Sequence, residues 1–62
     1  MNKMMNYKGH VIAKLNKKEQ KEKNTNYMVF TMDEWAYGEG FRYPEYDDCE
    51  TIDTAINLID SE

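Results

Sequence analysis

Apolar and polar side chains alternate between Tyr7 and Leu15. The odd positions carry apolar residues or glycine, and the even positions are polar except for Ile12. Because successive side chains of a strand point to opposite faces, this period of two predicts a half-buried strand over residues 7–15. Ile12, on the polar side, is then expected to pack beneath another element or another subunit.

A second apolar run, residues 27–32, has apolar side chains on both faces and is rich in residues that favour strands. It predicts a more central strand that pairs antiparallel with the first. The intervening residues 16–26 contain no apolar side chain, so we expect a solvated connection between the two strands. Together the two strands would form a hairpin with a long loop.

The next segment, residues 31–38, fits two structures. Thr31 and Glu34 have the spacing of a capping box, and Gly38 is suited to close a short helix after them. The same residues also fit a strand, a turn and a strand, and we favour a turn near residues 33–34.

The third strand of the sheet is expected to be short. Residues 38–40 predict a tight turn, and residues 41–43 a short extended segment. Pro44 would end it, because its nitrogen cannot donate a hydrogen bond to a neighbouring strand.

The C-terminal segment predicts an amphipathic helix. Asp47 is a good N-cap with Glu50 three residues later, and an apolar stripe follows at helical spacing. The stripe comprises Ile52, Ala55, Ile56 and Ile59. We therefore predict a single α+β domain over residues 1–62, in which one C-terminal helix packs across a small antiparallel sheet made of a hairpin and a short third strand.

The residue counts exclude several classes of protein. The chain has 62 residues with one cysteine, Cys49, and one histidine, His10. These numbers exclude a disulfide framework, a zinc site of four Cys or His ligands, a large enclosed active site and a membrane span. We therefore predict no cofactor, no metal and no membrane association. We also predict a cytoplasmic protein, because no apolar signal segment follows Met1.

So short a chain gains little free energy from its core. Ordering each residue costs about 1.5 kcal/mol, which a small core barely offsets. Self-association, most simply as a dimer, or folding against a partner is therefore expected.

Charge divides the chain into two halves. Residues 1–31 hold seven lysines against two glutamates, a balance of +5, and residues 32–62 hold one arginine against ten acids, a balance of −9. Such asymmetry concerns association and partner choice more than fold. The acidic half suggests a protein that binds and inhibits or occludes another protein, such as a host defence or nucleic-acid-handling protein, by imitating the charge of a nucleic acid.

The predicted partner-binding residues combine carboxylates with aromatic anchors. They are Tyr43, Glu45, Tyr46, Asp47, Asp48, Glu50, Asp53 and Asp60. The simpler interpretation is that these acids solvate the outer face of a helix and complement its dipole. In size and composition the chain is similar to many small accessory proteins of bacterial viruses, a resemblance that transfers no site.

Two other functions are carried as alternatives. The first is a homo-oligomer that sequesters a small ligand such as a nucleotide in an aromatic groove formed by Tyr37, Phe41, Arg42 and Tyr43. The second is nucleic-acid binding through the lysines of residues 17–23, which the net charge of −4 and the absence of aromatic residues there disfavour.

Catalysis is not expected. Cys49 and His10 lie on different predicted elements, and the acids that flank Cys49 oppose thiolate formation. We predict His10 to be a surface residue of its strand. The sequence thus predicts a protein without catalytic residues.

Overall fold

The computed structural model describes residues 1–38 and 43–62 of the chain. The described residues form four strands and three helices. The strands are β1 (Asn2–Tyr7), β2 (His10–Lys14), β3 (Tyr27–Thr31) and β4 (Tyr46–Cys49), and the helices are α1 (Lys17–Lys23), α2 (Met32–Tyr37) and α3 (Ile52–Asp60).

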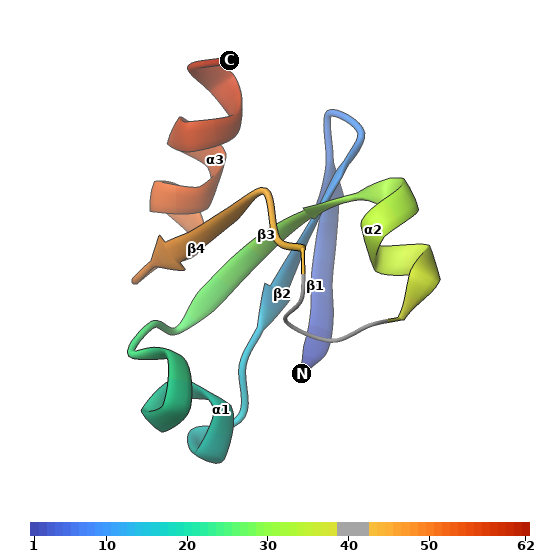
Figure 1. Ribbon diagram of the computed structural model, residues 1–62. Coiled ribbons are helices and arrows are strands. Elements are labelled where there is room, and N and C mark those ends of the chain that lie inside the picture. Colours follow the sequence, from blue (N-terminus) through green and yellow to red (C-terminus); the bar gives the residue numbers. More distant parts are fainter. Residues whose placement is uncertain (39–42) are drawn as a thin grey trace.

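The strands form one antiparallel sheet in the order β1-β2-β3-β4. Helix α1 joins β2 to β3, α2 follows β3, and α3 follows β4 (Figure 1). The predicted α+β class is confirmed, as is the packing of a C-terminal helix on the sheet. The sheet has one more strand than expected, and the described residues contain two further helices, α1 and α2.

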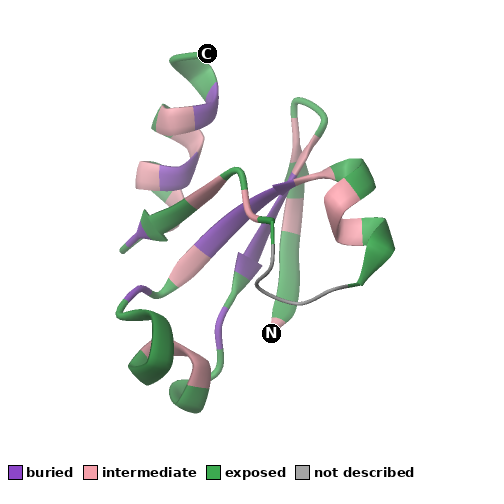
Figure 2. Ribbon diagram, in the orientation of Figure 1, coloured by how far each residue is buried: buried purple, intermediate pink, exposed green. Residues whose placement is uncertain are grey.

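The two central strands are buried on both faces. Residues 11–13 of β2 and 28–30 of β3 are all buried, and Figure 2 shows the buried residues concentrated on these strands. Side chains that alternate along a strand point to opposite faces, so such a run requires cover on both sides. Helices α3 and α2 supply it from opposite faces of the sheet (Figure 1).

Each face has its own cluster of buried residues. On the α3 face, Ile12 and Val29 pack with Ala55 and Ile59 of the helix. On the α2 face, Ala13, Leu15, Met28 and Phe30 pack together with Trp35, whose ring lies 5.6 Å from that of Phe30. The expectation that Ile12 packs beneath another element is confirmed.

The strand predicted over residues 7–15 is wrong at its beginning. Tyr7 ends β1, and His10 begins β2 after a tight turn in which Lys8 and Gly9 both have positive φ, 47° and 78°. Two successive left-handed residues are the geometry of the two-residue turn that suits the twist of a hairpin. Strand β1, of which the sequence pattern predicted only Tyr7 to be extended, forms the first edge of the sheet.

The predicted loop over residues 16–26 contains helix α1. Asn16 and Glu19 form a reciprocal capping box, and Asn24 ends the helix in the left-handed conformation with φ 56°. Helix α1 contains no apolar residue and no buried residue, so it has no apolar stripe that a sequence pattern could reveal. Its ends and its helix-favouring Lys, Glu and Gln residues define it instead.

The turn favoured near residues 33–34 is also wrong, because α2 occupies this segment. Thr31 and Glu34 form the capping box that their spacing allowed, and Gly38 ends the helix with φ 67°. Of the predicted extended segment 41–43, only Tyr43 lies among the described residues, where it is a bend rather than a strand.

The C-terminal helix begins later than predicted. Its N-cap is Thr51, whose hydroxyl accepts a hydrogen bond from the Thr54 amide, whereas Asp47 lies within β4. Strand β4 forms because Cys49 pairs with Tyr27 and Tyr46 with Val29, contacts between residues far apart in the sequence. These contacts make residues 46–49 the fourth strand instead of the first turn of a helix.

The Thr25 side chain connects to β4 through hydrogen bonds. Its buried hydroxyl accepts a hydrogen bond from the Cys49 amide at 2.8 Å and lies 3.0 Å from the Cys49 carbonyl oxygen, to which it donates. One side chain therefore satisfies both backbone groups of a buried strand residue.

Removing this hydroxyl should destabilise the protein. Thr25→Val keeps the side-chain shape but removes the buried hydrogen bonds of the hydroxyl to the Cys49 amide and carbonyl, which we expect to cost about 1–3 kcal/mol of unfolding free energy. Denaturant unfolding measures this loss. Thr25→Ser, which keeps the hydroxyl, is the control, and equal stability of the two variants would show that the hydrogen bonds contribute nothing.

Candidate functional site

The predicted acidic residues divide among three places in the structure. Asp47 and Asp48 lie on β4, an edge strand of the sheet, and both are exposed. Between the pairs Tyr27–Cys49 and Val29–Tyr46, β4 has one residue more than β3. Such a bulge interrupts the strict alternation of a strand, so two successive side chains are both exposed.

Glu50 and Asp53 are the next two acids along the chain, and Glu50 lines a hollow together with Lys17 and Lys21 of α1. Both are exposed, Glu50 directly after β4 and Asp53 in the first turn of α3. The position of Asp53 also complements the positive end of the α3 dipole. We refer to Asp47, Asp48, Glu50 and Asp53 together as the acidic edge.

Cys49, between these acids, is directed into the protein. It is fully buried in the cluster on the α3 face. Burial raises the pKa of the Cys49 thiol, and the negative charges of Asp48 and Asp47 raise it further. A protonated, enclosed thiol is a poor nucleophile, and the residue lies within β4 rather than at the helix start where the sequence placed it.

The aromatic candidates are less closely grouped. Tyr43 is 60% exposed and Tyr37, on α2, is 81% exposed, whereas Tyr46 is half-buried against the α3 face. Phe41 and Arg42 lie outside the described residues. The groove proposed for Tyr37, Phe41, Arg42 and Tyr43 therefore stays a prediction.

Asp60 lies apart from the acidic edge, at the far end of α3. Its carboxylate accepts hydrogen bonds from the Tyr7 hydroxyl at 2.9 and 3.1 Å and from the Lys8 ammonium group at 2.6 Å. These contacts lower the pKa of Asp60, first through Lys8 and then through Tyr7. Asp60 thus connects the β1–β2 turn to α3.

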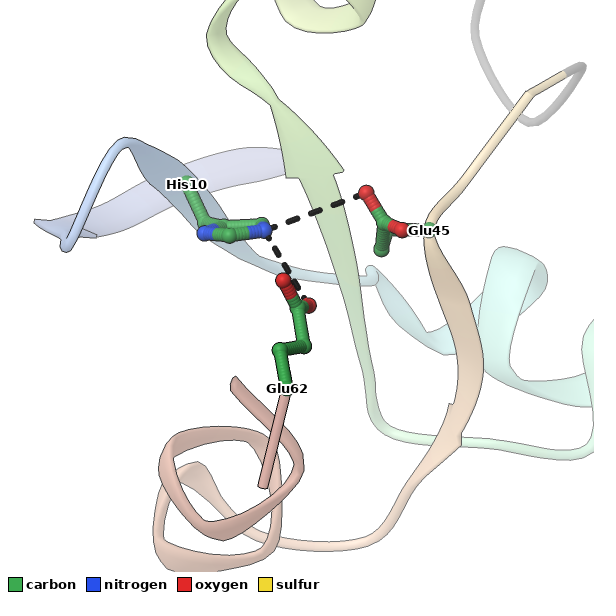
Figure 3. A group of neighbouring side chains, drawn as sticks. All are labelled: His10, Glu45 and Glu62. Atoms are coloured by element: carbon green, nitrogen blue, oxygen red, sulfur yellow. Dashed lines mark ion pairs between the residues drawn. The ribbon is translucent and has the colours of Figure 1, made fainter. Parts of the chain in front are cut away.

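A second group of side chains was not predicted. His10, Glu45 and Glu62 converge from three separate segments, as Figure 3 shows, with their ligand-type atoms all within 4.8 Å of one another. The His10 Nε2 atom lies 3.3 Å from Glu62 Oε2 and 3.8 Å from Glu45 Oε2. Within the described residues, no other three His, Cys, Asp or Glu side chains meet in this way.

Backbone contacts hold the three residues of this cluster in place. His10 is the first residue of β2, fixed by the tight turn before it. The Glu45 amide donates to the Val29 carbonyl at 2.7 Å, and the Glu62 amide donates to the Ile59 carbonyl at 3.2 Å. No local sequence pattern connects these positions, so the cluster is visible only in the folded chain.

The buried position of Cys49 can be tested by thiol labelling. We expect the folded protein to react with an aromatic disulfide reagent at least about a hundredfold more slowly than the denatured chain, because the thiol is both enclosed and protonated. Absorbance measured with and without denaturant gives the two rates. Similar rates would contradict the placement of Cys49 in the core.

The contacts of Asp60 predict a pH dependence of stability. Since the pKa of Asp60 is lowered in the folded state, its ionised form stabilises the fold above the ordinary value of 3.8, and this contribution is lost as the pH falls through the folded value. Asp60→Asn should therefore be less stable than the wild type near neutral pH, and the difference should shrink in acid. Unfolding curves over this range measure it.

The control for this prediction removes the partners of Asp60. In a Tyr7→Phe/Lys8→Met background the carboxylate has lost both donors, so Asp60→Asn should change the stability much less. A difference of the same size in both backgrounds would contradict the role given to these contacts.

No family model, curated protein or solved structure matches this chain. None of the helices in the described part of the chain combines the length and the apolar character that crossing a bilayer requires. The assignment of a function therefore rests on the chemistry of the acidic edge and of the His10 cluster.

Proposed function

We propose that this protein is a non-enzymatic interaction protein whose acidic edge binds a basic, phosphate-binding surface of another protein. The observation that carries the proposal is the composition of the segment from Asp47 to Asp53. Its exposed residues are the four acids of the acidic edge and one threonine, Thr51. A group of exposed carboxylates attracts a surface of the opposite sign and orients it on approach.

The bulge in β4 supports binding through side chains rather than through the strand backbone. A regular edge strand offers unpaired amides and carbonyls to a further strand, whereas a short, bulged and charged edge opposes such pairing. Asp47 and Asp48 both project from the edge at the bulge. A partner would therefore meet a row of carboxylates, which is the feature that a nucleic acid presents through its phosphates.

Charges on an edge strand also oppose aggregation. This role and partner binding predict different results when the charges are neutralised. If protection were their whole purpose, neutralising them would increase self-association and leave partner binding intact. If they form the binding surface, neutralising them removes the partner. The basic helix α1 offers a third outcome, in which the lysines of one copy pair with the acidic edge of another and the molar mass falls with added salt.

The test compares two variants of equal charge. Asp47→Asn/Asp48→Asn and Glu22→Gln/Asp33→Asn each change the formal net charge from −4 to −2, but only the first alters the acidic edge. Each variant and the wild type serve as bait in lysate of the source cell, with mass spectrometry as readout. We expect the edge variant to lose its partner by at least about tenfold, equivalent to about 1.4 kcal/mol, and the control to retain it.

Competition identifies the nature of the partner surface. Duplex DNA added to the captured complex should displace the protein if the acidic edge occupies a phosphate-binding surface, and added salt should weaken the complex. Equal capture by the two variants, or a complex that DNA leaves intact, would contradict the proposal.

A further inference from the structure

The His10 cluster has a defined histidine tautomer. His10 Nδ1 lies 3.0 Å from the Lys8 carbonyl oxygen. Because a carbonyl oxygen only accepts hydrogen bonds, this contact places a proton on Nδ1. In the neutral ring the lone pair is then on Nε2, the atom that faces the carboxylates of Glu45 and Glu62 (Figure 3). A histidine oriented by a backbone carbonyl through one nitrogen and free at the other is the arrangement found at metal sites.

We propose that His10, Glu45 and Glu62 bind a divalent transition-metal ion of the Zn²⁺ class. The donor set is one imidazole nitrogen and two carboxylates, which suits Zn²⁺ and its neighbours in the first transition row. Ca²⁺ and Mg²⁺ prefer sites made of oxygen atoms alone. The proposal does not depend on the acidic edge, because none of the four residues of that edge takes part in the cluster.

The distances fit such an ion with little movement. Zinc bonds of about 2.0–2.2 Å at tetrahedral angles separate neighbouring ligand atoms by about 3.3–3.6 Å. His10 Nε2 and Glu62 Oε2 are already 3.3 Å apart, and the 3.8 Å separation from Glu45 Oε2 is only slightly longer. Glu45 precedes β4, and its side chain is 36% exposed, so its carboxylate can approach that of Glu62, from which it is at most 4.8 Å away. Solvent would occupy the fourth position.

The charges of the cluster also favour a cation. Two carboxylates lie within 4.8 Å of each other beside an imidazole whose side chain is only 12% exposed. Like charges at this distance repel, and partial burial strengthens the repulsion. A divalent ion compensates both carboxylates at once and accepts the lone pair of Nε2.

Tyr46 orients one of the ligands. Its hydroxyl donates a hydrogen bond to Glu62 Oε2 at 2.9 Å, the same oxygen atom that lies nearest to His10 Nε2. Tyr46 is thus a positioning residue of the site rather than a ligand.

A bound ion would join three parts of the fold. His10 lies at the β1–β2 turn, Glu45 precedes β4, and Glu62 follows α3. A ligand that binds only the folded state stabilises it by mass action. The proposed ion would therefore fasten the hairpin and the edge strand to the C-terminal helix.

The test uses untagged protein and Zn²⁺ alone. Calorimetric titration should show one ion per chain, and the thermal midpoint of unfolding should rise with Zn²⁺. Since the chain has one histidine, its ring signals in NMR spectra belong to His10 without ambiguity, and Zn²⁺ should shift Nε2 much more than Nδ1. A Co²⁺ spectrum should lack sulfur charge-transfer bands, because Cys49 is buried.

Matched variants distinguish a built site from general attraction to an acidic protein. His10→Gln and Glu62→Gln each remove one ligand and should weaken Zn²⁺ binding by at least about tenfold, with loss of the thermal shift. Glu62 is exposed, so its variant should fold normally. Asp48→Asn removes the same charge as Glu62→Gln from the acidic edge and should leave the affinity unchanged. Tyr46→Phe should weaken binding by a smaller factor.

Either of two results would overturn the proposal. One is the absence of Zn²⁺ binding at concentrations up to about 1 mM. Weaker binding would not indicate a specific site. The other is equal weakening by Glu62→Gln and Asp48→Asn, which would show attraction to negative charge in general.

Discussion

The burial of two adjacent strands on both faces determines the rest of this protein. Residues 11–13 of β2 and 28–30 of β3 carry apolar side chains toward both sides of the sheet, so the chain must supply a cover for each side. Helices α2 and α3 do so with only six and nine residues. Helices this short are not stable alone in water, and their contacts with the sheet together with their N-caps stabilise them.

The edges of the sheet differ in character from its centre. Both β1 and β4 carry a register irregularity, near Met4 in the first and at Asp47 and Asp48 in the second. Irregular edges twist away from further strand pairing, which leaves side chains as the means of contact with other molecules. Four of the ten acids of residues 32–62 lie on β4 or shortly after it, and the lysines of α1 lie on a helix that has no buried residue.

Strong apolar patterns predicted their elements well. The run at residues 27–32 gave a central strand because its side chains are apolar on both faces, and the stripe from Ile52 to Ile59 predicted α3. Helix α1 was missed because its stability comes from Asn16, Glu19 and Asn24 at its ends rather than from an apolar face. The turn at Lys8 and Gly9 was missed because the period of two continues through it.

The wrong start of the C-terminal helix and the missed His10 cluster have one physical cause: both depend on contacts between residues that are far apart in the sequence. Asp47 and Thr51 are both suitable N-caps, and only the pairing of Cys49 with Tyr27 decides that the helix starts at the second. The acidic candidates could be proposed from the sequence because five of the six lie close together, between residues 45 and 53. The His10 cluster could not, since its members come together only through the sheet topology and the end of α3.

The C-terminal end of α3 carries negative charges at the negative end of the helix dipole, and a lysine of the first hairpin compensates them. A helix dipole is negative at this end and favours cations there, yet the last turn of α3 contains no basic residue and ends with Asp60, with Glu62 beyond it. Lys8 supplies the missing positive charge from a segment more than fifty residues earlier in the chain. The first hairpin and the last helix are therefore coupled: fraying of the hairpin removes a counter-charge from the end of α3.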